Sequence, residues 1–579
     1  MRGVRYPDAL HVSTVVAQRF FHRHGVGAPL TQPLTAPVRW RHLGFALVVA
    51  ILSAGRAGAQ CRQPASRFDP QWASMPMLAG AVEDRQRMLQ DLGRCTPAGY
   101  LVRSTSALTD SLLGAGPVRW AVVAPNIQST WNTALPFSMN DGTEWAGRGL
   151  TTTFTTGVRV EAGRFSATFA PQFVYQQNRD FLVFASGAAG RSDFASPWHS
   201  IGESADLPLR FGDQPTRLAT LGESRAELNV GPMAVGGSTE ALWWGPGIRN
   251  ALVMSNNAGG IPQLFVRTAR PIRTPIGDLE GRWLVGALTE SIYFDRDPSN
   301  DVRSLSSFVA TLNVAFDRGL TVGAARSVYA SVSSGSAVFG HAFDAFGRWD
   351  QSSDSTRTPG TPTDQIYSLF GRWVFPASGV EIYGEWAKLF PPSGLRELVV
   401  EPQRGQGFTV GVQWVRPVRA ASLLRTQFEA TMLEQTPPAL AAPVRSFYTS
   451  RLVPQGYTQR GQSIGAAIGP GSSSQWLAGD YIFGSNRAGL FVGRIRWEDE
   501  AYYRQPSSVA FFAHDVSIFA GIRGGASFYG VDLDLALQHT IRMNYLFQTA
   551  TSGYAPSPAF DIRSNAIRMT ITPINLRWR

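Results

Sequence analysis

The sequence predicts an all-β fold, a large antiparallel transmembrane β-barrel of the outer-membrane type with a small helical region ahead of it. Three observations predict this fold. Apolar and polar residues alternate with a period of two after residue 117, charged residues make up only 16% of the chain, and glycine and aromatic residues are abundant, at 58 residues and 11%. Soluble globular proteins carry about 25% charged residues. A sheet with one apolar face, one polar face and many tight turns accounts for all three observations.

Residues 39–59 have the pattern of a secretory signal peptide. Arg39 and Arg41 precede an apolar run that ends at Ala54, and Ala57 and Ala59 supply the small residues expected before a cleavage site. We therefore expect export to the outer membrane and a mature chain that begins near Gln60. Residues 1–38 lack useful periodicity, and we interpret them as an upstream extension caused by a start codon assigned too early.

The net charge of +11 does not indicate a nucleic-acid partner. Residues 1–59 carry seven arginines against one aspartate, and the remaining basic and acidic residues nearly balance. The arginines after residue 59 are scattered and form no basic run of the kind that phosphate backbones require.

Residues 60–116 are predicted to form a periplasmic helical cap or plug. Apolar residues recur at helical spacing over 75–92, where Ser74 offers an N-cap, Pro76 fits the first turn and Gly93 fits the C-terminal stop. A shorter helical pattern runs from Ala107 to Leu113. This region is too small to form much of a core unaided, so we expect it to dock on the barrel.

The only two cysteines, Cys61 and Cys95, lie within this region. In an oxidising periplasm we expect them to form a disulfide, and two free thiols are the alternative. The loop that the bond would close holds 33 intervening residues, which corresponds to about 3–4 kcal/mol in the chain-entropy model.

Residues 117–579 are predicted to form the barrel, with about 16–18 strands of the ~9–11 residues that span a bilayer. We expect the apolar face of each strand to meet lipid and the polar face to line the lumen. The alternation is shown by four apolar sets, which are Leu533, Leu535 and Leu537; Phe491 and Ile495; Phe308 and Leu312; and Leu369 and Trp373. A soluble sandwich would share the alternation.

Aromatic residues near the predicted strand ends favour the membrane version; they are Trp373, Phe375, Trp414, Trp497 and Trp578. The chain ends on alternating Ile574, Leu576 and Trp578. This is the kind of terminal strand that barrel-assembly machinery reads, although Arg579 replaces the usual terminal aromatic residue.

The sequence offers little that indicates catalysis, a cofactor or a metal. The four histidines after residue 59 are not paired at metal-ligand spacing, and phosphate-loop and zinc-protease motifs are absent from the sequence. Asp532 and Asp534 share one face of a predicted strand, where lumen-lining carboxylates are a better interpretation than an acid–base pair. We therefore expect no enzyme activity, no cofactor and no metal.

Four segments resemble the Wzi family of capsule-assembly outer-membrane proteins. They are Leu135–Gly149 (LPFSMNDGTEWAGRG), Ile201–Gly212 (IGESADLPLRFG), Ala241–Pro262 (ALWWGPGIRNALVMSNNAGGIP) and Thr268–Gly277 (TARPIRTPIG). The W-W-G-P-G…S-N-N-A core is the most specific part, and the resemblance in motif detail runs from about residue 75 to about residue 300. It implies a large antiparallel barrel capped by a periplasmic helical bundle, with a lectin-like role in retaining capsular or exopolysaccharide. The short helical region, its two cysteines and the longer loops depart from the family, so the polysaccharide recognised is expected to differ.

The core motif also has a physical interpretation. Gly245, Pro246 and Gly247 cannot continue a regular strand, so residues 243–250 must leave the sheet as a tight loop. Trp243 and Trp244 could then offer flat faces to sugar rings, or they could fold inward and plug the lumen. Polar side chains that could hydrogen-bond sugar hydroxyl groups are Arg249, Asn250, Asn256, Asn257, Asn140, Asp141 and Arg148, with Trp145 as a further stacking candidate.

Two classes of function remain. The first is a non-enzymatic protein that binds or organises polysaccharide at the cell surface, and the second is a porin-like channel for small solutes or oligosaccharides. Outer-membrane lipid or lipopolysaccharide and the barrel-assembly machinery are the other expected partners, and we expect a monomer.

Overall fold

The computed structural model describes residues 72–73, 78, 80–95, 100–105, 116–199, 203–347, 362–392, 394–419, 422–435, 445–504 and 510–573. The signal peptide, Cys61, the pattern from Ala107 to Leu113 and the terminal segment from Ile574 to Trp578 lie outside these residues.

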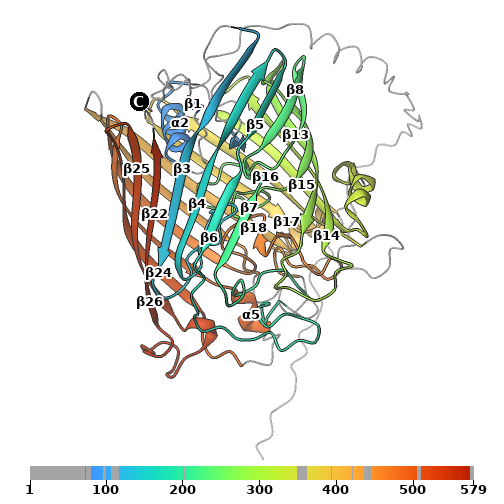
Figure 1. Cartoon of the computed structure of the whole chain (residues 1–579), viewed down its shortest axis with the longest axis vertical. Coiled ribbons are helices and arrows are strands. Elements are labelled where there is room, and N and C mark those ends of the chain that lie inside the picture. The colour runs from blue at the N-terminus through green and yellow to red at the C-terminus, as the bar shows by residue number, and fades with distance from the viewer. Residues whose placement is uncertain are drawn as a thin grey trace, which may run out of the picture. The chain divides into compact units, whose positions relative to one another are not determined.

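Eighteen strand positions close into one antiparallel barrel (Figure 1). Neighbouring positions pair along the chain up to the last strand, which pairs back with the first wall strand through Ala566 opposite Asn132. Three positions are each made of two shorter strands, namely β5 with β6, β7 with β8, and β11 with β12. The predicted barrel of about 16–18 strands is confirmed.

The strands of the wall are β3 (Val118–Asn132), β4 (Gly149–Ala162), β5 (Phe165–Phe169), β6 (Gln172–Gln176), β7 (Thr216–Thr220), β8 (Arg225–Val230), β9 (Met233–Ser238), β11 (Gln263–Thr268), β12 (Ile272–Thr274), β13 (Gly277–Thr289), β14 (Val302–Val314), β15 (Leu320–Ser331), β16 (Thr363–Phe375), β17 (Val380–Lys388), β18 (Gln406–Arg419), β19 (Ser422–Met432), β22 (Ser473–Phe483), β23 (Asn486–Arg496), β24 (Val516–Phe528), β25 (Val531–Met543) and β26 (Ile562–Pro573). Elements other than these are the short strands β1 (Trp72–Ala73), β2 (Val102–Ser104), β10 (Leu242–Trp244), β20 (Thr458–Gln459) and β21 (Gln462–Ser463), and the helices α2 (Ala81–Asp91), η2 (Gly335–His341), η3 (Asp344–Phe346), α3 (Leu395–Val400), α5 (Asp499–Arg504) and η5 (Tyr545–Phe547).

The two ends of the barrel differ in their connections. Short turns such as 163–164, 231–232, 484–485 and 529–530 join strands at one end, which we call the turn end. Long connections such as 133–148, 239–262, 332–362 and 433–472 join strands at the other end, which we call the loop end. Helix α2 lies at the turn end and α5 at the loop end (Figure 1).

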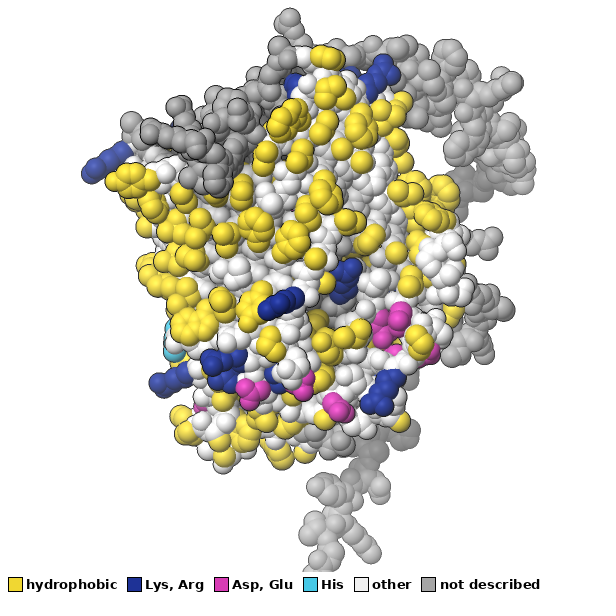
Figure 2. Space-filling model, in the orientation of Figure 1, with side chains coloured by type: hydrophobic (Ala, Val, Ile, Leu, Met, Phe, Trp, Pro, Cys, Tyr) yellow, Lys and Arg dark blue, Asp and Glu magenta, His cyan; other side chains and the backbone are white. Residues whose placement is uncertain are grey.

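The outer wall carries a broad belt of exposed apolar side chains (Figure 2). As predicted, Leu369, Trp373, Leu535 and Leu537 face outward. Exposed Trp120, Trp373 and Trp414 lie toward the turn end and exposed Trp131 toward the loop end, as in the aromatic girdles of outer-membrane barrels.

The predicted outward face of β23 is wrong. Phe491 and Ile495 are buried in the lumen, whereas Leu490 and Val492 are 65% and 49% exposed on the outside. The alternation was predicted correctly, but its two faces were exchanged. The lumen next to β23 is filled with other side chains, so its wall is apolar there too.

Helix α2 inverts the expected amphipathic pattern. It begins at Ala81 rather than at 75 and ends at Asp91, and Gly93 follows with a positive φ of 65°, as the stop signal predicted. Its buried side chains are Glu83, Arg87, Met88, Gln90 and Asp91, whereas Val82 and Leu89 are only half-buried. The charged face is buried because the barrel mouth that receives it is lined by charged side chains. Among the described residues, no helix combines the length and the apolar character that crossing a membrane requires.

The disulfide between Cys61 and Cys95 stays a prediction, because Cys61 lies outside the described residues. We expect the exported protein to contain this bond, because both cysteines lie in the region predicted to be in the periplasm, which is oxidising. Mass spectrometry of the purified protein under non-reducing conditions, after alkylation, would show neither thiol modified. Alkylation of both cysteines without prior reduction would contradict the prediction.

Candidate functional site

Three segments from the loop end fold into the lumen, and we call their described residues together the plug: 133–148, 239–262, and 433–435 with 445–472. Their apolar side chains form one cluster with lumenal side chains of the wall. Leu305, Tyr329 and Ile366, which face the lumen from three neighbouring strands, are each 0% exposed. At the level of the plug, the lumen of the described barrel is therefore packed like a protein core.

Trp243 and Trp244 are fully buried in this plug. They belong to β10, which pairs antiparallel with β2. The Arg103 guanidinium lies 4.9 Å from the centre of the Trp243 ring, and the backbone N–H of Trp244 donates to the Met254 carbonyl at 3.0 Å. Neither ring presents a face to solvent, so of the two alternatives that the sequence left open, packing inside the lumen accounts for both.

Two glutamates of the wall hold the Gly-Pro-Gly turn. Glu429 on β19 accepts the N–H groups of Ile248 at 2.5 Å, Arg249 at 3.0 Å and Asn250 at 2.9 Å. Glu385 on β17 accepts the N–H of Leu252 at 3.0 Å. Gly247 lacks a side chain for a steric reason, because a Cβ there would lie 2.0 Å from the Asn250 carbonyl oxygen. The turn leaves the sheet as predicted, and the backbone N–H groups that follow it bind it to β17 and β19.

The polar residues predicted from the two loops do meet. Asn140 donates from its side chain to the Arg249 carbonyl at 2.7 Å, and its N–H donates to the Asn257 side chain at 3.2 Å. Arg249 lies over the Trp476 ring at 4.4 Å. The other contacts of this group join it to the chain: Asn250 to Thr431 and Ser474, Asn256 to Leu78, Asn257 to Ser463, Asp141 to Arg568, and Arg148 to Thr133 and Asp180. The group thus ties the plug together and to the wall.

Sequence reasoning missed the third plug segment. Tyr448 and Tyr457 are fully buried there, with their rings stacked 6.1 Å apart. Their hydroxyl groups donate to the carbonyls of Leu252 and Val253, each at 2.9 Å. The hydrophobic residues of this segment have no regular period. Only the burial of its aromatic residues distinguishes it from a surface loop, and the sequence does not show that they are buried.

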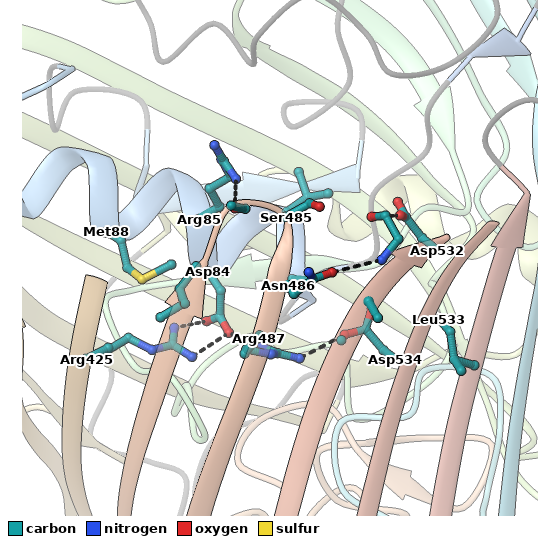
Figure 3. Close-up of a pocket in the computed structure, with 17 residues that line it drawn as sticks. Asp84, Arg85, Met88, Arg425, Ser485, Asn486, Arg487, Asp532, Leu533 and Asp534 are labelled. Carbon is teal, nitrogen blue, oxygen red and sulfur yellow. Dashed lines mark hydrogen bonds and ion pairs between the residues drawn. The ribbon is translucent and has the colours of Figure 1, made fainter. Parts of the chain in front are cut away.

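At the turn end, α2 is held in the barrel mouth by buried ion pairs. Arg372 on β16 reaches Asp91 at 3.0 Å and Glu381 at 2.6 Å. Figure 3 shows a second group, in which Asp84 contacts Arg425 at 3.0 Å and Arg487 at 3.1 Å. These contacts border a cavity of about 170 Å³ between α2 and the wall. Burial favours the neutral acid, but the two guanidinium groups hold the pKa of Asp84 at about 2.

Four half-buried aromatic rings form a cluster on the loop end, which we call the aromatic cluster: Trp145, Phe194, Phe211 and Tyr293. Trp145 lies 4.7 Å from Phe211, Phe211 lies 5.8 Å from Tyr293, and Tyr293 lies 5.9 Å from Phe194. Three separate loops supply these rings. Among the predicted aromatic candidates Trp145 alone keeps part of its surface open, and the sequence did not identify its three partners.

Glu144 gives the plug a pH dependence. Burial, reinforced by repulsion from Asp141, raises the pKa of Glu144 to about 8. The folded state therefore holds a proton that the unfolded state releases near pH 4.3. The stabilisation is complete at low pH and is lost as the pH rises through about 8. We expect amide hydrogen exchange in 133–148, corrected for its intrinsic rate, to increase between pH 6 and pH 9.

A Glu144→Gln variant is the matched control for this prediction. Glutamine keeps the shape of the neutral acid and does not ionise, so the increase should be much smaller in the variant. Equal increases in the two proteins would contradict the assignment to Glu144.

Among the described residues, no group of three or more histidine, cysteine, aspartate or glutamate side chains is placed to hold a metal ion. The arrangement offers packing, ion pairing and ring surfaces.

Comparison with known proteins identifies one matching family model and several similar solved structures. The family model of the capsule assembly protein Wzi matches residues 128–488. Among solved structures, the chain is similar to Wzi of Escherichia coli, an outer-membrane protein involved in group 1 capsule assembly and a carbohydrate-binding β-barrel. That similarity has a TM-score of 0.52 at 12% identity and covers 78% of this chain and 85% of that chain.

Two other solved structures are less similar. The outer-membrane channel DcaP of Acinetobacter baumannii has a TM-score of 0.30 at 9% identity and covers 79% of this chain and 97% of that chain. OccK2 (OpdF) of Pseudomonas aeruginosa in complex with glucuronate has a TM-score of 0.36 at 8% identity and covers 79% and 98%. No match was found among curated proteins.

Proposed function

Because the chain belongs to the family of the capsule assembly protein Wzi, we propose that it binds capsular or exopolysaccharide at the cell surface and takes part in capsule assembly without enzymatic chemistry. The observation that carries the proposal is the packed lumen. A barrel that is filled by its own chain has no open path for solutes at the level of the plug, so a ligand would bind to its outer-facing loops. A porin-like role would require a continuous path past the three plug segments.

We infer the orientation from the lengths of the connections. Outer-membrane barrels have short periplasmic turns and long extracellular loops. The turn end with α2 therefore faces the periplasm, and the loop end with the aromatic cluster faces outward. The apolar belt contacts outer-membrane lipid. We expect a monomer that barrel-assembly machinery inserts.

The proposal is tested by deleting the gene and measuring cell-attached and shed polysaccharide. The deletion strain should synthesise normal total amounts, but shed a larger fraction into the medium. Restoring the full-length chain should return the polysaccharide to the cells. Unchanged retention in the deletion strain would contradict the proposal.

The aromatic cluster is the surface that we propose for direct contact with sugar. Flat rings stack on sugar faces, and loss of one ring should cost about 0.5–1.5 kcal/mol if sugar stacking resembles other aromatic contacts. Replacing Trp145 by alanine should therefore weaken binding of purified polysaccharide by roughly 2- to 13-fold. The buried pair Trp243 and Trp244 contributes through packing instead.

Two control variants make this binding test specific. Trp145→Phe keeps a ring and should recover most of the affinity. Tyr554→Ala removes a ring that is 99% exposed on another loop and should change nothing. Equal losses in Trp145→Ala and Tyr554→Ala, or no loss in either, would rule out the aromatic cluster as the binding surface while leaving the role in capsule assembly open.

A further inference from the structure

The outer wall of β14–β17 is polar near the loop end, unlike the apolar belt elsewhere. The outward-facing side chains there include Ser306, Arg326, Gln365, Tyr367 and Lys388. They alternate along their strands with lumenal residues of the packed core, such as Leu305, Ile366 and Ala387. All five are nevertheless buried.

Two loop segments cover this polar wall from outside, and we call them the collar: residues 335–347, with η2 and η3, and residues 390–392 and 394–405, with α3. In Figure 1 the first of them is the short yellow-green helix that lies outside the barrel beside β14. Ser306 donates from its hydroxyl group to the Ala342 carbonyl at 2.7 Å, and Trp283 donates from its ring N–H to the same carbonyl at 3.0 Å. The Phe343 ring stacks on Trp283 at 4.9 Å with an interplanar angle of 12°.

The collar solvates two outward-facing cations of the wall. Arg326 donates to the carbonyls of Ala345 at 3.2 Å and Gly347 at 3.0 Å, and to the Gln365 side chain at 2.8 Å. Lys388 donates to the Pro402 carbonyl at 3.2 Å and lies 5.6 Å from the Trp386 ring centre. These carbonyl oxygens occupy the place that water would take around an exposed cation.

The collar exposes large apolar side chains, beside the exposed Arg396 and Glu401. Six large side chains are exposed on it, namely Phe339 (58%), Phe343 (68%), Phe346 (54%), Leu395 (81%), Val399 (78%) and Val400 (64%). An amphipathic segment with a polar inner side and an apolar outer side is the pattern expected for an element that lies between a polar surface and lipid.

The collar lies at the depth of the membrane. Ser306 is four residues from the loop end of β14, which at ~3.3 Å per residue and a strand tilt of ~40° places it about 10 Å below that end. Elsewhere on the barrel, apolar side chains are exposed at this depth or nearer the loop end. Trp131 on β3 is 45% exposed, Met432 at the end of β19 is 37% exposed, and Ile518 on β24 is 49% exposed.

We propose that the collar is immersed in the outer leaflet of the outer membrane, with its six apolar side chains among lipid acyl chains. An outward-facing arginine or lysine costs about 2–4 kcal/mol at the middle of a bilayer and less toward its surface, so the wall needs such a cover at this depth. The apolar outer side of the collar lies at the same depth as the belt of exposed apolar side chains on the rest of the wall. Lipid is therefore its occupant rather than water or a second copy of the chain.

The test places a spin label on the collar of the full chain reconstituted into phospholipid vesicles. Phe343→Cys and Leu395→Cys carry the label in separate proteins, each on a different collar segment. If one variant does not fold, the other still reports whether the collar lies in lipid. Leu369→Cys on the belt and Tyr554→Cys on an exposed loop are the references. Labels on the collar should match Leu369, with high accessibility to oxygen and low accessibility to a water-soluble nickel complex.

Two outcomes would overturn the proposal. High accessibility to the nickel complex, as expected at Tyr554, would place the collar in water. Low accessibility to both reagents would mean that protein covers the collar, and spin–spin broadening between labels would then identify a second copy. None of these outcomes depends on polysaccharide binding, so the collar and the proposed function fail independently.

Discussion

Planar bilayers that contain the purified protein should show little or no steady conductance, whereas the double variant Glu385→Ala, Glu429→Ala should conduct. The two carboxylates accept four backbone N–H groups of the plug. An amide left buried without an acceptor costs about 1–3 kcal/mol, so the pair of changes costs about 4–12 kcal/mol. That is comparable with the whole stability of a typical domain, and the Gly-Pro-Gly turn should leave its place in the lumen.

The control for this experiment is Asp278→Ala. Asp278 pairs with Arg318 at 2.8 Å on the turn end, where the arginine side chain is 58% exposed. Loss of such a pair costs about 0–1 kcal/mol, and this variant should show as little bilayer conductance as the unmodified protein. Large, stable openings in the unmodified protein, together with normal polysaccharide retention in the deletion strain, would overturn the binding function and leave the channel.

Replacing Arg372 by alanine should release α2 from the barrel mouth and destabilise the protein by about 3–5 kcal/mol, the cost of breaking a buried pair. The side chain is 1% exposed and joins Asp91 of the helix to Glu381 of the wall. Its loss leaves Asp91 buried without this cation. Denaturant unfolding would measure the loss of stability, and tryptic cleavage at Arg85 and Arg94 would report release of the helix.

Two further variants define the cause. Arg372→Lys keeps the charge but not the planar group that contacts two carboxylates at once, so it should recover only part of the stability. Arg318→Ala removes an exposed arginine and should change the unfolding free energy by about 0–1 kcal/mol. Equal effects of Arg372→Ala and Arg318→Ala would show that the buried network does not hold α2.

The barrel could be predicted from the sequence because its signal is local. Side chains of a strand alternate between two faces whatever the strand packs against, so the period of two survives along β14, β16 and β25. Which face meets lipid is not local. On β23 the lumenal face is apolar, because plug residues that lie elsewhere in the chain pack against it.

The same difference separates the predicted from the missed parts of the site. The family-like segments pointed to candidates within residues 140–148 and 243–257, and the structure brings these two loops together at Asn140 and Arg249. The burial of Trp243 depends on Arg103, which precedes it by about 140 positions, and no local pattern reveals that contact. Phe211 lies within a family-like segment, but its place beside Trp145 and Tyr293 arises only when three loops meet. The charged inner face of α2 likewise depends on the arginines of the wall.

The closing ladder between β26 and β3 determines the order in which this protein can fold. Ala134, just beyond β3, donates its N–H to the Ser564 hydroxyl group across 430 positions of the chain. Bringing such distant segments together costs more loop entropy than any neighbouring hairpin does, and folds rich in distant contacts form slowly. The hairpins from β13 to β25 can therefore form first, whereas the ring stays open until the last strand is available. Until then β3 and the newest strand present unpaired edges, which are templates for aggregation.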